Sequence, residues 1–325
     1  MVKLLIYLPA LNEEEKLAKV LNSLPKKISG LDSVDVLVVD DGSTDATPDI
    51  AISCNVKLIS HRENKGLSRV FETALNYALD YNYDLMVSID ADGQFNSNQI
   101  CDLIAPILEG NCDFTTGNRF KLGKPKNMSS LKFWGNKQIS KIVSFVGGQK
   151  IRDVSCGFRA YSKNCLRSIN LHGKYTYTHE TILDLLDKNY KIKEIDIDVT
   201  YFDGRVSRVA NNIFKYAFKT FTIIIKCLKD YQPFSFFSFI SFVIFSLGVI
   251  IGSFVVLHWI KTGAITPYKS IGFLALAIEL VAFLVFVLAL IADMLTRIRK
   301  NQEKILFCFL FRVAFNFQLF QFLQF

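Results

Sequence analysis

Two long apolar segments near the C-terminal end of the chain constrain its fold most strongly. Residues 234–260 contain no formally charged side chain, and residues 271–292 contain only one, Glu279. Each segment exceeds the roughly 20 residues that a helix needs to cross a bilayer. The sequence therefore predicts a transmembrane hairpin over residues 233–296, with spans at about 234–260 and 271–293. Glu279 within a span is either a functional group or a carboxyl group that faces the other helix.

Basic residues flank this hairpin mainly on one side. They precede the first span and follow the second, whereas the connecting loop has fewer: Lys226, Lys229, Arg297, Arg299, Lys300 and Lys304. By the positive-inside rule, the preceding domain and the segment after the second span lie in the cytoplasm. Seven cysteines without CxxC or metal-ligand spacing agree with a reducing compartment. We expect an integral membrane protein whose large N-terminal domain is cytoplasmic.

The segments around the hairpin have compositions of their own. Four lysines of residues 211–232 fall in one narrow sector of a helix, with aromatic and aliphatic residues elsewhere, which predicts an amphipathic helix in the membrane interface. Residues 297–325 form a basic and then Phe-rich tail. The net charge is +8, but the lysines that flank the membrane spans explain a basic patch better than nucleic-acid binding does, so we predict a lipid bilayer as partner and no nucleic acid. The hairpin also offers a surface for homo-oligomer formation.

Residues 1–210 are predicted to form a separate α/β domain. Short apolar runs at residues 4–8, 34–39, 56–60 and 85–89 predict strands, and helical patterns lie between them. Such alternation predicts a Rossmann-type, mostly parallel sheet with helices on both faces. Ser43 and Thr44 are suited to cap a helix that begins near Asp45.

Polar residues follow each of the four predicted strands. These clusters are Pro9, Asn12 and Glu13; Asp40 and Asp41; Asn64, Lys65 and Gly66; and Asp90, Asp92 and Gln94. Ligands of a doubly wound sheet bind beyond the carboxyl ends of its strands. All four clusters on one edge therefore predict a single binding site.

Asp90 and Asp92 form the most informative pair. Side chains at positions i and i+2 of an extended chain point the same way, and Ala91 between them is small. Two carboxylates and the amide oxygen of Gln94 make a hard oxygen site, which suits Mg²⁺ or Mn²⁺. A solvated acidic turn is the alternative.

The ordered motifs PALNEE, VVDDGSTD, ENKG, DADGQ, TGNRF and DVSCGFRAY resemble family 2 glycosyltransferases of the GT-A fold over residues 3–210. They are most similar to the dolichyl- or polyprenyl-phosphate sugar synthases. The resemblance implies an inverting transfer from a nucleotide-sugar, GDP-mannose or a UDP-hexose, to polyprenyl or dolichyl phosphate, with Mg²⁺ or Mn²⁺ as cofactor. The product would be a sugar linked to a lipid phosphate.

The resemblance also implies roles for single residues. The nucleotide-sugar would contact Pro9, Asn12, Glu13, Asp40, Asp41, Lys65, Asp90, Ala91, Asp92, Arg205 and Arg208. The catalytic residues would be Asp92, Arg119, Asp153 and Arg159, and the metal ligands Asp90, Asp92 and Gln94. The acceptor phosphate would meet Arg119, Arg205 and Arg208. His179 and Glu180 would head a helix on the acceptor side. We expect His179 to be a surface histidine and not a catalytic base. A lipid phosphate is already anionic near neutral pH, so the reaction needs little deprotonation.

Other interpretations stay open at this point. The enzyme could act on another glycan, lipid or protein acceptor, or the chain could be a non-catalytic binding protein of the same fold. Arg119 could be a structural partner of a carboxylate, and Arg159 could pair with Asp153.

Overall fold

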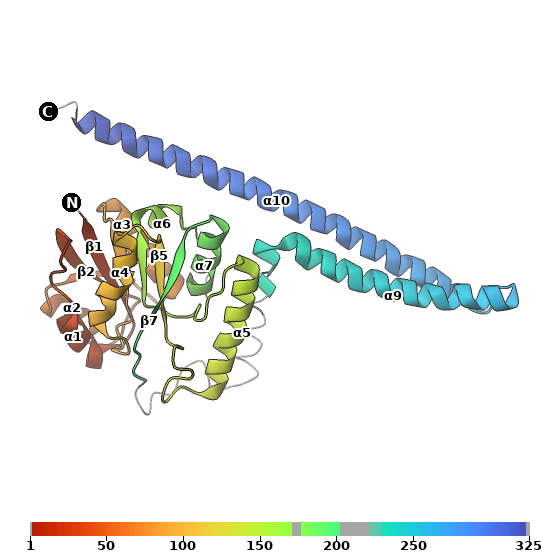
Figure 1. Ribbon diagram of the computed structural model, residues 1–325, viewed down its shortest axis with the longest axis horizontal. Coiled ribbons are helices and arrows are strands. Elements are labelled where there is room, and N and C mark those ends of the chain that lie inside the picture. The colour runs from red at the N-terminus through yellow and green to blue at the C-terminus, as the bar shows by residue number, and fades with distance from the viewer. Residues whose placement is uncertain (1, 171–176, 202–221, 223–224, 227, 323–325) are drawn as a thin grey trace. The chain divides into compact units, whose positions relative to one another are not determined.

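The computed structural model describes residues 2–170, 177–201, 222, 225–226 and 228–322 (Figure 1). The chain divides into two compact units, residues 1–224 and residues 225–325. The sheet lies in the first unit and the two longest helices lie in the second.

The first unit is built on one seven-stranded sheet. Its strands are β1 (Lys3–Ala10), β2 (Ser33–Asp40), β3 (Lys57–Ser60), β4 (Leu85–Ser88), β5 (Phe114–Asn118), β6 (Arg159–Ser162) and β7 (Ile192–Asp196). The order across the sheet is β3-β2-β1-β4-β6-β5-β7. β6 runs antiparallel to both of its neighbours, and the other pairings are parallel. The predicted mostly parallel sheet is confirmed, and β6 starts at the edge where the other strands end.

Helices cover both faces of this sheet (Figure 1). They are α1 (Glu14–Ser23), α2 (Thr47–Ser53), α3 (Leu67–Asp80), α4 (Ile100–Leu108), α5 (Ser130–Gly147), α6 (Lys163–Ser168) and α7 (Tyr177–Asp187), with the 3-10 turn η1 (Ser97–Gln99) before α4. On one face, apolar residues of α1, α2 and α4 pack on alternate residues of β1, such as Leu4 and Ile6. On the other face Phe71 of α3 stacks on Tyr177 of α7 and meets Tyr7 of β1. Period-two alternation along each strand thus produces two buried layers.

The predicted cap of the second helix is wrong. α2 begins at Thr47, and its N-cap residue Ala46 makes no side-chain capping bond. Ser43 instead accepts a hydrogen bond from the backbone N–H of Asn12 at 2.9 Å. The Asn12 side chain accepts one from the N–H of Thr44, also at 2.9 Å. The two polar residues therefore join neighbouring loops and do not start a helix.

The second unit is a pair of long helices, α9 (Pro233–Thr262) and α10 (Lys269–Phe322). α9 and residues 269–302 of α10 are long and apolar enough to cross a membrane. α10 is one continuous helix, so it runs on without a break through the predicted boundary at residue 297. The predicted interface helix over residues 211–232 lies largely outside the described residues.

Small buried residues recur every seven positions where α9 and α10 meet. They are Ser241 and Gly248 on α9, where Val255 continues the repeat, and Ala275, Ala282 and Ala289 on α10. Ser241 donates a hydrogen bond to the carbonyl oxygen of Ala282 at 2.7 Å. A Cβ atom at Gly248 would stand 2.9 Å from the Cγ of Glu279, so the stem of this acidic residue lies against α9. Small residues at this spacing let two helices approach closely.

Candidate functional site

The edge formed by the carboxyl ends of the parallel strands carries most of the predicted site. The loop after β1 holds Pro9, Asn12 and Glu13, and the loop after β2 begins with Asp40. Asp40 is buried and accepts a hydrogen bond from the N–H of Ser43 at 3.1 Å. Because Asn12 also binds this second loop, the two loops form one connected wall.

Asp41 is turned into the protein. Its carboxylate accepts hydrogen bonds from the backbone N–H groups of Lys65 at 2.9 Å and Gly66 at 2.8 Å. It also meets Nδ1 of His61 at 2.8 Å, and the other ring nitrogen lies 3.0 Å from the hydroxyl of Thr73. The side chain of Lys65 is exposed. Asp41 therefore fixes the loop that follows β3 in front of α3.

Asp90 lies in a strongly anionic corner after β4. Burial and the nearby Asp92 carboxylate raise the pKa of Asp90 to about 7, and Glu13 adds to the effect. Arg119 and Arg159 act in the opposite direction. Asp92 accepts a hydrogen bond from the N–H of Gln94 at 3.0 Å, which closes a tight turn. A nearby cation would favour the ionised form of Asp90.

Gly157 makes room for the Asp90 carboxylate. A Cβ atom at this glycine would stand 2.9 Å and 3.0 Å from the two carboxylate oxygens. The carbonyl oxygen of Gly157 also accepts a hydrogen bond from Ser88 at 2.6 Å. The glycine of the DVSCGFR motif is thus required by a close approach between loop and carboxylate.

Arg119 and Asp153 form a buried, bidentate ion pair. Nε and Nη2 of Arg119 donate to the two oxygens of Asp153 at 2.6 Å and 2.8 Å. The side chains are 8% and 0% exposed. Arg119 further donates to Ser155 at 2.9 Å and to Tyr201 at 3.2 Å. Burial disfavours the charged guanidinium, but Asp153 outweighs that effect and raises the pKa of Arg119. Burial alone would raise the pKa of Asp153, whereas Arg119 holds it below its ordinary value.

Arg159 does not pair with Asp153. It is fully buried at the start of β6 and donates to the carbonyl oxygens of Cys156 at 2.7 Å and Val154 at 2.9 Å. Its guanidinium lies 5.7 Å above the ring of Phe114. Nη1 has no hydrogen-bond partner among the described residues. Arg159 therefore holds the 154–156 loop through two of its nitrogen atoms.

His179 lies in the first turn of α7, but it is not the surface residue that we expected. It is buried, and burial together with the positive charge of Arg159 lowers its pKa to about 4. The imidazole is therefore neutral at physiological pH. Its Nε2 atom has no hydrogen-bond partner within the described part of the chain.

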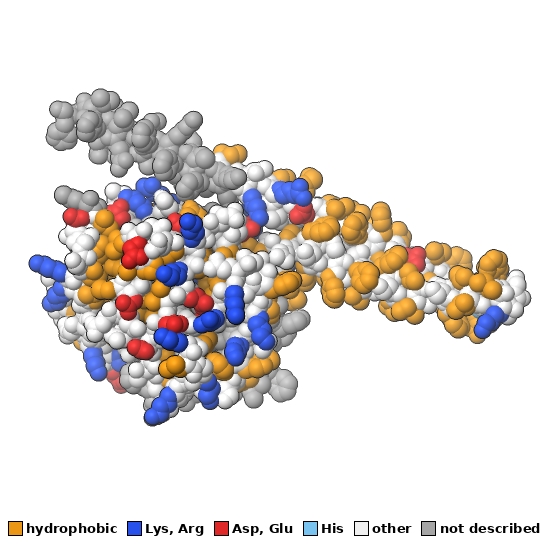
Figure 2. All heavy atoms as spheres, in the orientation of Figure 1, with side chains coloured by type: hydrophobic (Ala, Val, Ile, Leu, Met, Phe, Trp, Pro, Cys, Tyr) orange, Lys and Arg blue, Asp and Glu red, His pale blue; other side chains and the backbone are white. Residues whose placement is uncertain are grey.

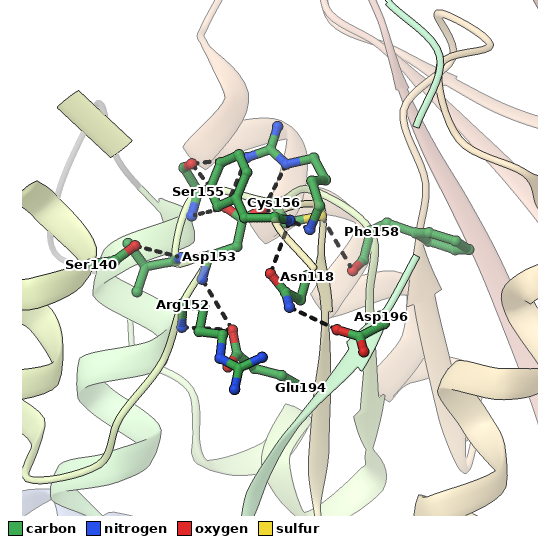
Figure 3. Close-up of polar contacts among 12 residues, drawn as sticks. Asn118, Ser140, Arg152, Asp153, Ser155, Cys156, Phe158, Glu194 and Asp196 are labelled. Carbon is green, nitrogen blue, oxygen red and sulfur yellow. Dashed lines mark hydrogen bonds and ion pairs between the residues drawn. The ribbon is translucent and has the colours of Figure 1, made fainter. Parts of the chain in front are cut away.

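Three residues that no sequence pattern singled out complete this region. Ser155 and Tyr201 bind Arg119. Glu194 of β7 accepts hydrogen bonds from the backbone N–H groups of Arg152 and Asp153 at 2.7 Å and 3.0 Å (Figure 3). Ser155 stands inside the DVSCGFR motif, and that position is the one signal that could have found it. In the sequence, Glu194 cannot be distinguished from an ordinary solvent-facing residue of a strand.

The predicted site residues thus fall into two connected groups. One joins the loops after β1, β2 and β3, and the other joins the loops after β4 and β5 with the start of β6. Arg205 and Arg208 lie outside the described residues. Among the residues that are described, three or more His, Cys, Asp or Glu side chains nowhere gather into a metal-binding group. The oxygen donors at the anionic corner are Asp90 and Asp92, with Gln94 close by in the chain.

This fold and these motifs have known relatives. A family model described as "Glycosyl transferase family 2" matches residues 5–169. The chain therefore belongs to glycosyl transferase family 2, and it is a glycosyltransferase.

Among similar proteins is the UDP-N-acetylglucosamine–dolichyl-phosphate N-acetylglucosaminyltransferase of Methanococcus voltae, which is 32% identical over 64% of this chain and 90% of its own length. The polyprenol monophosphomannose synthase of Mycolicibacterium smegmatis is 26% identical over 66% of this chain and 84% of its own. Glucosyl-3-phosphoglycerate synthase of Mycobacterium tuberculosis, solved with UDP, superposes with a TM-score of 0.56 at 19% identity, over 70% of this chain and 79% of the other. This last likeness shows a shared GT-A fold.

Proposed function

We propose that the protein transfers a sugar from a nucleotide-sugar, GDP-mannose or a UDP-hexose, to polyprenyl or dolichyl phosphate. The observation that carries this proposal is the anionic corner of Asp90 and Asp92 beside the buried arginine of the Arg119–Asp153 pair. Such a corner suits a metal-bound diphosphate, and a neighbouring cation suits a second phosphate. Relatives named for dolichyl-phosphate and polyprenol-phosphate transfer support the choice of acceptor.

A divalent cation fits the donor set. Asp90, Asp92 and Gln94 would hold Mg²⁺ or Mn²⁺ through oxygen atoms. Burial and the neighbouring Asp92 carboxylate raise the pKa of Asp90, and a bound cation would favour its ionised form. A related fold has been crystallised with Mn²⁺ and UDP. When bound, the cation would neutralise charge that develops on the nucleotide leaving group. Asp40 and the wall formed by Asn12 and the β2–α2 loop would surround the base and ribose.

The acceptor phosphate needs cations, because it must approach a donor that is itself anionic. Arg119 has five N–H groups, and four of its hydrogen bonds go to Asp153, Ser155 and Tyr201. The remaining N–H, on Nη1, is the group that we assign to the acceptor phosphate, with Arg205 and Arg208 as further candidates. In this proposal Asp153 and Arg159 act as positioning residues, because both are fully buried and hold protein groups, Arg119 and the 154–156 loop respectively.

The reaction needs no strong base. A lipid phosphate is anionic near neutral pH and already nucleophilic. The pKa of His179 is about 4, so its imidazole is neutral near physiological pH and is only a weak base. Orientation of the two substrates and stabilisation of charge would supply most of the rate.

The proposal also includes membrane anchoring. Two helices of sufficient length and apolarity support a hairpin in the bilayer. The excess of basic residues beside the spans favours a cytoplasmic location for the glycosyltransferase domain.

A donor screen tests the proposal. The purified full chain, in proteoliposomes that contain polyprenyl phosphate, is incubated with labelled nucleotide-sugars, and the lipid-linked product is counted. We expect transfer from one nucleotide-sugar, loss of activity in EDTA and recovery with Mn²⁺ or Mg²⁺. Asp92→Asn should abolish transfer without changing thermal stability, since it is nearly isosteric. Asp102→Asn, at an exposed position in α4, makes the same chemical change away from the site and should be active.

Two results would overturn parts of this proposal. Full activity in chelator would exclude the metal site. Absence of product with every nucleotide-sugar, from protein whose unfolding temperature is normal, would exclude polyprenyl phosphate as the acceptor.

A further inference from the structure

One stretch of the first unit has an unusual charge. Residues 119–152 contain nine lysines and arginines and no aspartate or glutamate. The rest of the chain carries one more acidic residue than basic residues, so this stretch accounts for the whole positive net charge. It consists of the loop after β5, the helix α5 and the segment that leads toward β6. A cationic field is thus concentrated on one part of the glycosyltransferase domain.

The outward side of α5 combines these cations with large apolar groups. Trp134, Lys137, Lys141 and Phe145 follow one another at spacings of three and four residues and form a single exposed stripe. Trp134 and Phe145 are 59% and 76% exposed, and Leu122 in the preceding loop is 95% exposed. Figure 2 shows basic side chains gathered over α5. We refer to Leu122, Trp134, Lys137, Lys141 and Phe145 as the α5 surface.

We propose that the α5 surface docks on a membrane whose headgroups are anionic. Tryptophan and phenylalanine between lysines are the side chains that enter the boundary between headgroups and acyl chains, while the lysines bind the headgroups. Charge complementarity selects this occupant, because an apolar protein partner would leave the lysines without counter-charges. This docking goes beyond the hairpin anchor, and it rests on the proposal that the chain is anchored in a bilayer.

The inner side of α5 connects this surface to the candidate site. Ser144 accepts a hydrogen bond from the N–H of Ile151 at 2.9 Å. Ser140 accepts one from the N–H of Val154 at 3.3 Å (Figure 3). Asp153, the partner of Arg119, lies between these two anchoring points. Docking of α5 would therefore hold the segment that orients Arg119 at the membrane surface, which is where a lipid phosphate lies.

The test uses the two tryptophans of the chain as separate reporters. Trp259→Phe leaves Trp134 on the α5 surface, and Trp134→Phe leaves Trp259 in α9. Each full-length variant is reconstituted in vesicles of phosphatidylcholine, with or without phosphatidylglycerol, that carry a headgroup-proximal doxyl quencher. We expect Trp134 to be quenched in anionic vesicles and less in neutral ones. The difference should disappear at high salt, because the attraction is screened within about 10 Å at 0.1 M.

Charge reversal provides the matched control. Lys137→Glu with Lys141→Glu, in the Trp259→Phe background, should lower the ratio of docked to undocked domain by on the order of tenfold or more. Lys26→Glu with Lys27→Glu makes the same change in net charge at two exposed lysines outside the α5 surface, and quenching of Trp134 should persist.

The outcomes separate the two proposals. Quenching of Trp259 without quenching of Trp134 would leave the hairpin anchor intact and overturn docking. A blue-shifted Trp134 that the lipid quencher does not reach would mean that protein covers the surface, either a second copy or another chain, and would overturn it as well. Quenching of neither tryptophan would overturn both proposals. If quenching of Trp134 is the same in neutral and anionic vesicles and does not change with salt, the electrostatic basis of docking is overturned.

Discussion

Removal of the Asp153 carboxylate should destabilise the first unit far more than loss of an ordinary ion pair. In Asp153→Ala, Arg119 would lose both side-chain hydrogen bonds of its ion pair and the acceptor of its backbone N–H. Its side chain would keep only the hydrogen bonds to Ser155 and Tyr201. Its guanidinium would remain buried without a counter-charge. Breaking a buried pair in this way costs about 3–5 kcal/mol. For a domain of this size, that corresponds to a fall of roughly 6–20 °C in the unfolding temperature.

The unfolding temperature can be measured on the full chain in detergent with a thiol-reactive fluorogenic dye. Cys112 and Cys165 are free and buried in this unit, so the dye reports when it opens. Glu72→Ala is the matched control, because it removes the acidic partner of Arg69 from a pair whose side chains are 46% and 58% exposed. That control should change stability by about 0.5 kcal/mol or less.

A double variant separates an unpaired charge from simple loss of packing. Arg119→Met combined with Asp153→Ala removes both charges, and should be less destabilised than Asp153→Ala alone. Two results would show that the buried, unpaired charge of Arg119 is not the cause of the destabilisation. One is an Asp153→Ala variant that behaves like the Glu72→Ala control, and the other is a double variant that is no more stable than the single one.

Four further predictions concern other parts of the chain. Gly157→Ala should lower the transfer rate about tenfold with little change in thermal stability, since its methyl group would displace the Asp90 carboxylate; a normal rate across a Mn²⁺ titration would contradict this. Asp41→Ala should cost about 2 kcal/mol in the dye assay, because two backbone N–H groups lose their acceptor. The pKa of Asp153 is lowered in the folded state, so the stability that this gives is present above the ordinary value of 3.8 and is lost as the pH falls through the folded value; the Arg119→Met, Asp153→Ala double variant should lose less stability on acidification. A cysteine-accessibility reporter at residue 265 should be non-cytoplasmic and one at residue 2 cytoplasmic, and the opposite result would reverse the proposed topology.

Much of the fold could be predicted because it depends on patterns that are local in the chain. Short, largely apolar runs of five or six residues, separated by helical patterns, predicted β1 to β4 within one or two residues of their observed ends. The two apolar segments were predicted in the same way, from their length and composition. The DADGQ and DVSCGFR motifs marked the loops that carry Asp90 and Asp153. What the sequence could not supply was the identity of the groups that these side chains meet.

Only the tertiary structure decided those partners. Asp153 binds Arg119, 34 residues earlier, because β6 lies between β4 and β5 and runs antiparallel to them, which brings the 153–159 segment to the edge where β5 ends. The same arrangement sets Gly157 against Asp90. Periodicity in a sequence tells which face of its own strand or helix a side chain occupies. The partner across the sheet depends on strand order and direction, and these are set by the packing of the whole domain.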